Sequence, residues 1–201
     1  SAFTMTKIRA GAQVNVSFDQ SGTGYYRDAE RPAPYNVIGI PADLVARAGG
    51  SVPPGDIGFR YGPAAPGGTP ATRVSTRWAG SAIAFTFNAD LGSYTVTSDG
   101  RTETDALTGA AVAPTNVIVQ YVRQSPSGNY DVNGVNTPIV NVVGTGAVAV
   151  LRGGQAWTGT WQRASAKDPM KLTSAAGQQI TLAQGQTWVL LVPRGQSAPV
   201  S

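Results

Sequence analysis

The chain has 201 residues, and its composition of 41% hydrophobic and only 13% charged residues, with 25 glycines and 14 prolines, is typical of a globular protein with frequent turns. It contains no cysteine and no histidine, which excludes disulfides, thiolate or imidazole metal ligands, and catalytic triads built on histidine. The net charge is +4, but the basic residues are scattered along the chain, so we expect no nucleic-acid partner.

The chain is expected to open with a strand followed by an ordered loop. Val14, Val16 and Phe18 alternate with polar residues over residues 13–18, which is the period of a half-buried strand. Residues 21–36 are rich in turn formers and dense in charges and aromatic rings. We predict that this loop is ordered and that its charged side chains pair with distant residues, because immediate neighbours are too close for good bidentate geometry.

Residues 41–48 are the best candidate for a helix. They begin with a proline, which the first helical turn tolerates, and two glycines follow the segment as a stop signal. We expect Leu44, Val45 and Ala48 to face inward.

The remainder of the chain is expected to be almost entirely β. Short apolar or alternating runs predict strands at residues 72–78, 82–88, 93–98, 116–123, 137–143, 147–152, 155–162, 179–182 and 187–192. Between them lie glycine-containing turns suited to antiparallel hairpins, at Asp99-Gly100, Gly153-Gly154 and Ala176-Gly177.

These elements predict an α+β, β-rich fold of antiparallel sheets with one or two short helices. We expect an N-terminal α+β segment over residues 1–72, which would be the end of a larger N-terminal domain. A β-rich C-terminal domain over residues 73–195 and a tail over residues 196–201 would follow. No stretch reaches the roughly 18 apolar residues that cross a bilayer, so we expect no membrane-spanning segment within this sequence.

The tryptophans of the β-rich region are expected to lie in its core. Trp157, Gly159 and Trp161 share one face of a strand, where the glycine would leave space for the two indoles. The alternative is a stacking surface for a sugar or a peptide. Trp188 lies on an apolar face of the last strand and is predicted to anchor the core.

Carboxylates are the remaining candidates for acid–base chemistry. The candidates are Asp28 with Glu30, Glu103 with Asp105, and Asp131. None has a spacing specific for glycoside hydrolysis, and aspartate is common in turns. No cluster has the spacing of a calcium loop, so we expect neither a metal site nor a cofactor.

Several separated segments resemble the YerB-like family of bacterial lipoproteins. They are Tyr26-Arg27-Asp28, the run from Arg31 to Asn36, Asn116 to Gln120, Val142 to Gly146, Gly159-Thr160-Trp161, and Gly185 to Val189 with Val192-Pro193. The resemblance implies an extracytoplasmic, lipid-anchored bacterial protein with a β-rich C-terminal domain and no established biochemical role. Tyr35 stands where similar proteins tend to have histidine, and the histidine often found shortly before Asp105 is absent.

We therefore expect a non-enzymatic binding or scaffolding module of the cell envelope. Its expected contact surface consists of Tyr26, Arg27, Asp28, Arg31, Tyr35 and Asn36, because arginine and tyrosine anchor protein interfaces. The same arginines and carboxylates could instead form an internal network that fixes the loop. The alternative function is a carboxylate-dependent hydrolase of cell-wall glycan or peptide, which would use Asp28 or Glu30 with Asp105.

The expected partners follow from this location. They are an envelope protein or peptidoglycan. Family members carry an N-terminal region ahead of this stretch, so that region, or a second copy of the chain, could also pack on an uncovered face.

Overall fold

The computed structural model describes residues 14–50, 55–78, 80–130 and 134–201. They divide into two compact units, here called unit 1, which ends at Gly55, and unit 2, which begins at Asp56. Within the described ranges, no helix has the length and apolar character needed to cross a membrane.

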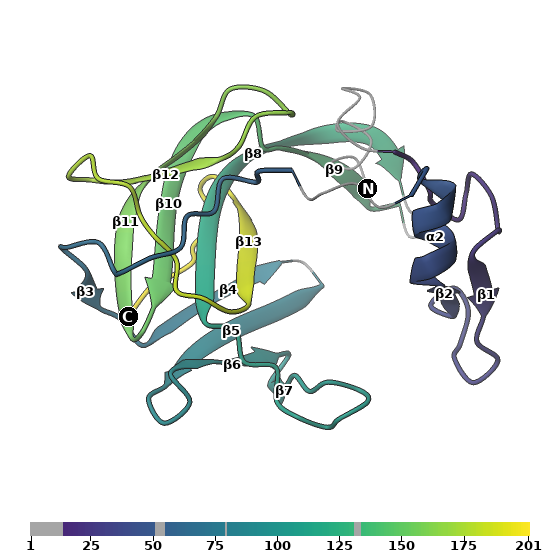
Figure 1. Cartoon of the computed structure of the whole chain (residues 1–201), viewed down its shortest axis with the longest axis horizontal. Coiled ribbons are helices and arrows are strands. Elements are labelled where there is room, and N and C mark those ends of the chain that lie inside the picture. The colour runs from purple at the N-terminus through teal and green to yellow at the C-terminus, as the bar shows by residue number, and fades with distance from the viewer. Residues whose placement is uncertain (1–13, 51–54, 79, 131–133) are drawn as a thin grey trace. The chain divides into compact units, whose positions relative to one another are not determined.

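Unit 1 contains a two-stranded antiparallel sheet and a short helix (Figure 1). Strand β1 (Tyr25–Arg27) pairs with β2 (Val37–Gly39), and helix α2 (Pro41–Arg47) follows. The proline lies in the first turn of the helix, as predicted. Gly49 and Gly50 follow the helix with positive φ angles, which glycine adopts without strain.

Helix α2 buries less than its sequence pattern predicts. Leu44 is half-buried, but Val45 is 44% exposed, so the prediction that Val45 faces inward is wrong. The reason is the small size of the sheet, whose two strands have three residues each. Leu44 occupies the available space, since a Cβ added at Gly39 would lie 2.9 Å from Leu44 Cδ1.

The strand predicted over residues 13–18 is not formed in the part of this segment that the structure describes, from residue 14 onward. The Asn15 side chain accepts a hydrogen bond from the Ser17 N–H at 3.0 Å. Such local bonds compete with a strand ladder. The segment is held instead by the Tyr25 hydroxyl, which donates to the Val16 carbonyl at 2.9 Å.

Unit 2 is a β-sandwich of two sheets (Figure 1). The larger sheet has the order β12-β11-β10-β8-β13, with β3 beside β11 and β9 beside β8, and the smaller has the order β4-β5-β6-β7. The predicted β-rich fold is therefore confirmed. The strands are β3 (Thr69–Pro70), β4 (Arg73–Trp78), β5 (Ser81–Asn88), β6 (Ser93–Ser98), β7 (Arg101–Thr102), β8 (Asn116–Tyr130), β9 (Asn136–Asn141), β10 (Gly144–Arg152), β11 (Gln155–Arg163), β12 (Lys171–Ser174) and β13 (Thr187–Pro193).

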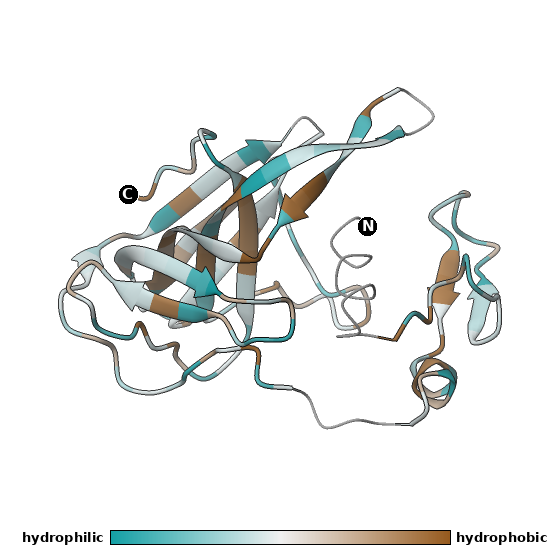
Figure 2. Ribbon diagram, turned by 90° about the horizontal axis from the view of Figure 1, so that it is seen from above, coloured by the Kyte–Doolittle hydropathy of each residue, from teal (hydrophilic) through white to brown (hydrophobic). Residues whose placement is uncertain are grey.

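A hydrophobic core lies between the two sheets. The smaller sheet contributes Phe85 and Tyr94, and the larger contributes Val117 and Leu151, all of them fully buried. Figure 2 shows hydrophobic residues gathered along the strands of this sandwich. Burial of apolar side chains from both sheets is the main stabilising contribution to unit 2.

The larger sheet is also covered on its second face. The segment that leads into β3 crosses this face (Figure 1), and the Trp157 indole N–H donates to the Ala65 carbonyl at 2.9 Å. The Arg152 guanidinium donates to the carbonyls of Gly62 and Thr181. A strand with two covered faces has a continuous run of buried residues, as β8 has over residues 116–120.

The two tryptophans of β11 are buried, as predicted, but on the second face of the larger sheet and not in the core between the sheets, and they leave no exposed surface for stacking. Gly159 has a different role from the expected one, because a Cβ there would lie 1.9 Å from the Thr173 carbonyl oxygen. It therefore permits the close approach of β12. Gly146 makes a similar space on β10, across which the Trp161 indole N–H donates to the Tyr121 carbonyl at 2.8 Å.

The tight hairpins have the predicted turn chemistry. Gly153 and Gly154 connect β10 to β11 with φ angles of 57° and 72°. Asp99 and Gly100 connect β6 to β7 with φ angles of 46° and 82°. Two successive positive φ angles match the twist of the flanking strands.

The last strand departs from the expected antiparallel arrangement. β13 runs parallel to β8, with Trp188 opposite Val117. The chain leaves β12 at one end of the strand order and enters β13 at the other, and this crossover permits parallel pairing. Trp188 is half-buried against the core, and its ring packs edge-on against Phe85 with the centroids 5.5 Å apart.

The strand predicted at residues 179–182 is also absent. This segment forms only single bridges, one between Gln179 and Thr173 and one between Leu182 and Tyr61. It does not form a ladder because its two ends pair with different segments of the chain.

The last residues lie along the outer edge of β4. Arg73 and Ser201 exchange backbone hydrogen bonds of 2.8 and 2.9 Å, and the Ser75 N–H donates to the Pro199 carbonyl at 3.4 Å. Residues 197–201 therefore cover the edge of the smaller sheet that would otherwise be open to pairing.

Candidate functional site

The six predicted contact residues lie together in the β1–β2 hairpin of unit 1. Local hydrogen bonds hold its long loop. The Asp28 N–H donates to the Asn36 carbonyl at 2.8 Å, and the Arg27 guanidinium donates to the Asn36 side-chain oxygen at 2.7 Å. The Asp28 carboxylate accepts from the Glu30 N–H at 2.9 Å and from Arg31 Nε at 3.0 Å. The loop is therefore ordered, as expected from its sequence.

The expectation that its charged side chains pair with distant residues is wrong. Asp28 pairs with Arg31, three residues away, because the chain turns at once after β1. Arg27 pairs across the mouth of the hairpin, and its guanidinium carbon also lies 5.4 Å from the centre of the Phe18 ring. A loop that folds back on itself brings together side chains whose pairing the linear sequence does not reveal.

The hairpin presents aromatic and cationic groups to solvent. The side chain of Tyr35 is 80% exposed and that of Tyr26 is 53% exposed. Arg31 is also exposed, and its partner Asp28 is only partly covered. Because the Arg31–Asp28 pair is not buried, it is not a clasp that seals an interior carboxylate. The Arg31–Asp28 pair is therefore an exposed charge pair and not part of an internal network.

Two of the carboxylates considered for catalysis, Asp28 and Asp105, accept hydrogen bonds within turns. Asp105 accepts hydrogen bonds from the Leu107 N–H at 3.1 Å and from the Thr108 N–H and hydroxyl at 2.8 and 2.9 Å. These bonds, those from Thr108 foremost, lower the pKa of Asp105. A carboxylate held ionised in this way is poorly suited to act as a general acid. Asp131 lies outside the described residues.

None of the four hollows on the described surface that could serve as clefts is lined by two carboxylates. A carboxylate-dependent hydrolase needs two such groups facing one bound substrate. The arrangement of the described residues therefore supplies no observation in favour of hydrolysis.

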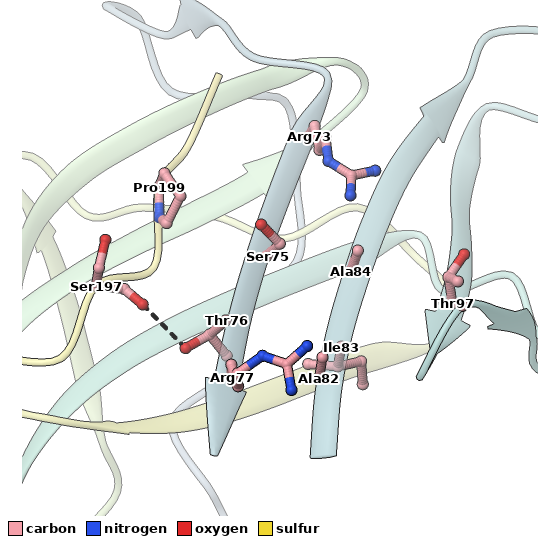
Figure 3. A pocket seen from close by; sticks show the side chains of 11 residues that line it. Arg73, Ser75, Thr76, Arg77, Ala82, Ile83, Ala84, Thr97, Ser197 and Pro199 are labelled. Atoms are coloured by element: carbon pink, nitrogen blue, oxygen red, sulfur yellow. Dashed lines mark hydrogen bonds between the residues drawn. The ribbon is translucent and has the colours of Figure 1, made fainter. Parts of the chain in front are cut away.

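The largest of these hollows, of about 440 Å³, lies on the outer face of the smaller sheet (Figure 3). Small side chains, among them Ser75, Ala84 and Thr97, form its floor. Two arginines of β4, Arg73 and Arg77, extend over it, and no acidic residue lines it. This site was not expected from the sequence. Alternation along β4 could have placed both arginines on one face, but not the hollow beside them.

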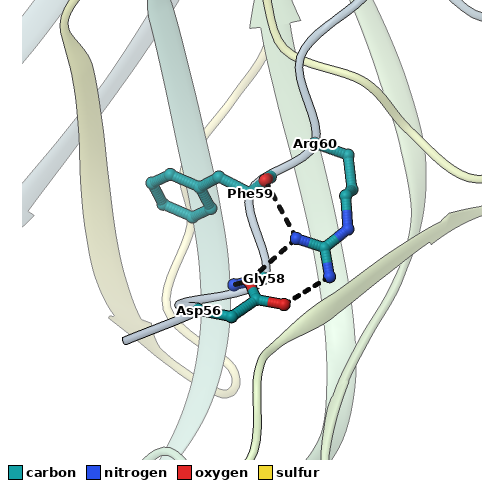
Figure 4. Close-up of polar contacts among 4 residues, drawn as sticks. All are labelled: Asp56, Gly58, Phe59 and Arg60. Carbon is teal, nitrogen blue, oxygen red and sulfur yellow. Dashed lines mark hydrogen bonds and ion pairs between the residues drawn. The ribbon is translucent and has the colours of Figure 1, made fainter. Parts of the chain in front are cut away.

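A second ordered charge pair lies at the start of unit 2 (Figure 4). Arg60 donates two hydrogen bonds to the Asp56 carboxylate, at 2.8 and 2.6 Å, and the Gly58 N–H donates a third at 2.8 Å. The Arg60 hydrogen bond is the main cause of a lowered pKa of Asp56, which is about 2. Both side chains are exposed, so this pair orders a loop and contributes little to stability.

Comparison with known proteins identifies the family of the chain. Residues 73–189 match the family described as "Protein of unknown function (DUF3048) C-terminal domain". The chain belongs to the DUF3048 family. The match contains the strand residues that line the hollow, but not Ser197 and Pro199, and it contains most of the larger sheet. A search of curated proteins found no match.

A solved structure has a similar fold. The DUF3048 chain is similar to the crystal structure of the YerB protein from Bacillus subtilis, with a TM-score of 0.71 and 17% sequence identity. The similarity covers 100% of this chain and 68% of the YerB chain. The YerB-like character expected from the sequence is thereby confirmed, and at this identity the likeness shows the fold.

Proposed function

We propose that this chain is a non-enzymatic binding or scaffolding module of the bacterial cell envelope, which contacts its partner through the β1–β2 hairpin. The observation that carries the proposal is the exposure of Tyr26 and Tyr35 beside two arginines on an ordered hairpin. Tyrosine and arginine are enriched among the residues that dominate binding energy. An ordered loop also loses little conformational entropy when it binds.

The proposed location is extracytoplasmic, at a membrane to which a lipid anchor outside this chain attaches the protein. The support for this location is the resemblance of the sequence to YerB-like lipoproteins. The partner that fits the hairpin best is another envelope protein, because exposed tyrosines with neighbouring arginines are typical of protein interfaces. Peptidoglycan is the second partner that the location allows.

Site-specific photocrosslinking in envelope extract tests the proposal. A benzophenone amino acid replaces Tyr35, and the control places it at Leu107, which is 97% exposed in unit 2. We expect a discrete adduct from position 35 that is absent from position 107 and that disappears in the Arg31→Ala background. Sedimentation with purified peptidoglycan tests the second partner in the same variants.

Two results would contradict the proposal. One is the same set of adducts from both positions, which would indicate non-specific collision. The other is the absence of any adduct from position 35 together with no binding to peptidoglycan.

A further inference from the structure

We propose that the hollow on the outer face of the smaller sheet binds an elongated ligand that carries at least two anionic groups. This site lies in unit 2 and uses none of the hairpin residues, so it goes beyond the function proposed above. Four observations support it: the spacing of two arginines, the lack of an acidic partner for either arginine, the coverage of the strand edge, and the small residues of the floor.

The first observation is the placement of Arg73 and Arg77. Residues four apart on a strand lie on the same face and are separated by about 13 Å along the strand. Figure 3 shows both guanidinium groups extending over the hollow beside β4. A guanidinium binds a carboxylate or a phosphate through paired N–H donors. Two of them at this spacing suit a ligand with two separated anionic groups better than a single small anion.

The second observation is that neither arginine is paired with an acidic residue, because the nearby Asp99 carboxylate accepts from the Ala82 N–H at 2.8 Å and forms no ion pair with them. No acidic residue lines the hollow. Arg73 has only the neutral Thr86 hydroxyl as a side-chain partner, at 2.9 Å. Within the described part of the chain, the Arg77 guanidinium has neither a hydrogen bond nor an ion pair. Both cations are therefore available to an external anion.

The third observation concerns the backbone. β4 pairs with β5 on one side and is covered by residues 197–201 on the other, so a peptide cannot bind here by adding a strand. Binding must use side chains. The lining side chains that can donate hydrogen bonds to a ligand include the two guanidinium groups and the hydroxyls of Ser75, Thr97 and Ser197.

The fourth observation is the shape of the floor between the arginines. Ala82 and Ala84 face the hollow from β5, opposite Arg77 and Ser75. Their small side chains leave room for the ligand to lie close to the sheet. Because the floor is neutral, the affinity and its dependence on salt should come from the two cations.

Calorimetric titration of the full chain tests this site. The probes are linear hexaglutamate and linear hexaphosphate, which separate the carboxylate and phosphate sources of the same anionic chemistry. Acetate and inorganic phosphate are the single-group controls. The variants are Arg73→Gln and Arg77→Gln, and the matched control is Arg101→Gln, which removes the same charge from β7 outside the hollow. Unchanged unfolding transitions would establish that each variant is folded.

We expect at least one hexamer to bind more tightly than its single-group control. Each of the two β4 variants should weaken that binding about tenfold, and Arg101→Gln by less than about twofold. The tighter of the two hexamers indicates the natural anionic group. Failure of both hexamers to bind would overturn the proposal, as would equal losses in Arg101→Gln and Arg77→Gln. These variants leave the hairpin intact, so a negative result for the hollow would not affect the photocrosslinking result.

Discussion

Different interactions stabilise unit 1 and unit 2. In unit 2, consecutive residues of β8 are buried on both faces of a sheet, and the side chains of two sheets meet in one core. In unit 1, helix α2 has no buried residue, and the hairpin is held largely by polar contacts of its own loop. The buried side chains of unit 2 therefore stabilise its fold, whereas the exposed side chains of the hairpin are available for the proposed contact.

This separation explains why the exposed aromatic residues of unit 1 deserve a functional interpretation. Large apolar or aromatic groups usually contribute to stability by being removed from water. Tyr35 and Tyr26 are mostly exposed, so burial does not account for them. In unit 2, by contrast, the indoles of β11 are buried and their role is structural.

The largest expected effect tests whether burial dominates unit 2. Trp161→Ala should lower the free energy of unfolding by about 3–5 kcal/mol, because it removes a fully buried indole and its hydrogen bond to Tyr121. Urea unfolding followed by the fluorescence of the remaining tryptophans, all of them in unit 2, measures this loss. Trp161→Phe should lose less. If Trp161→Ala lowered the free energy of unfolding by less than about 1 kcal/mol, burial would not be the main source of stability in unit 2.

The next largest loss of stability is expected where the backbones of β11 and β12 pack closely. Gly159→Ala should destabilise unit 2 by about 3 kcal/mol, because the added Cβ would collide with the backbone of β12. Gly80→Ala, where a Cβ would meet nothing within 4 Å, is the control and should change stability by less than about 0.5 kcal/mol. Thermal unfolding of the two variants side by side gives the result. Similar melting temperatures would mean that β12 moves away at little cost.

The buried Tyr94 hydroxyl tests how polar groups affect the stability of the core. Tyr94 is fully buried, and burial raises its pKa to about 12. No hydrogen bond of regular geometry reaches its hydroxyl, although the Gly154 N–H lies close enough to offset part of the pKa shift. Tyr94→Phe should therefore leave stability unchanged or raise it by about 1 kcal/mol in urea unfolding. A loss of more than about 1 kcal/mol would show that Gly154 does satisfy the hydroxyl.

The smallest effect concerns the exposed pair at the start of unit 2. The pKa of Asp56 is lowered from 3.8 to about 2, so the pair's contribution to stability is present above pH 3.8 and is lost as pH falls through about 2. NMR titration of the Asp56 carboxyl carbon should show this pKa in the native chain and a value nearer 3.8 in Arg60→Ala. Arg101→Ala should leave the value unchanged. A native pKa near 3.8 would mean that the pair does not persist in solution.

The sequence predicted those parts of the fold that depend on local chemistry. The Gly153-Gly154 hairpin followed from turn preference, and the helix after Ile40 followed from its proline and its terminal glycines. The parallel pairing of β13 with β8 was missed because an apolar strand carries no signal for its direction. The strand predicted over residues 13–18 was wrong because the Asn15 side chain offers the backbone a competing bond.

The sequence also located a candidate surface better than it predicted the contacts within it. The hairpin residues were recognised by their density of charge and aromatic rings. Their pairing depends on how the loop folds back, which spacing alone does not specify. The hollow beside Arg73 and Arg77 was missed because residues of three separate strands form its floor, and the sequence does not show how their side chains are arranged.

One substitution tests the separation of binding from stability most directly. Arg31→Ala should abolish capture of the partner at position 35, while the free energy of local opening of the hairpin changes by less than about 0.5 kcal/mol. Hydrogen exchange of the Asp28 and Ile40 amides, both bonded within unit 1, measures that opening. Two results for Arg31→Ala would contradict the account. One is retained capture of the partner, and the other is a loss of about 2–5 kcal/mol in the free energy of local opening, as expected for an unpaired buried carboxylate.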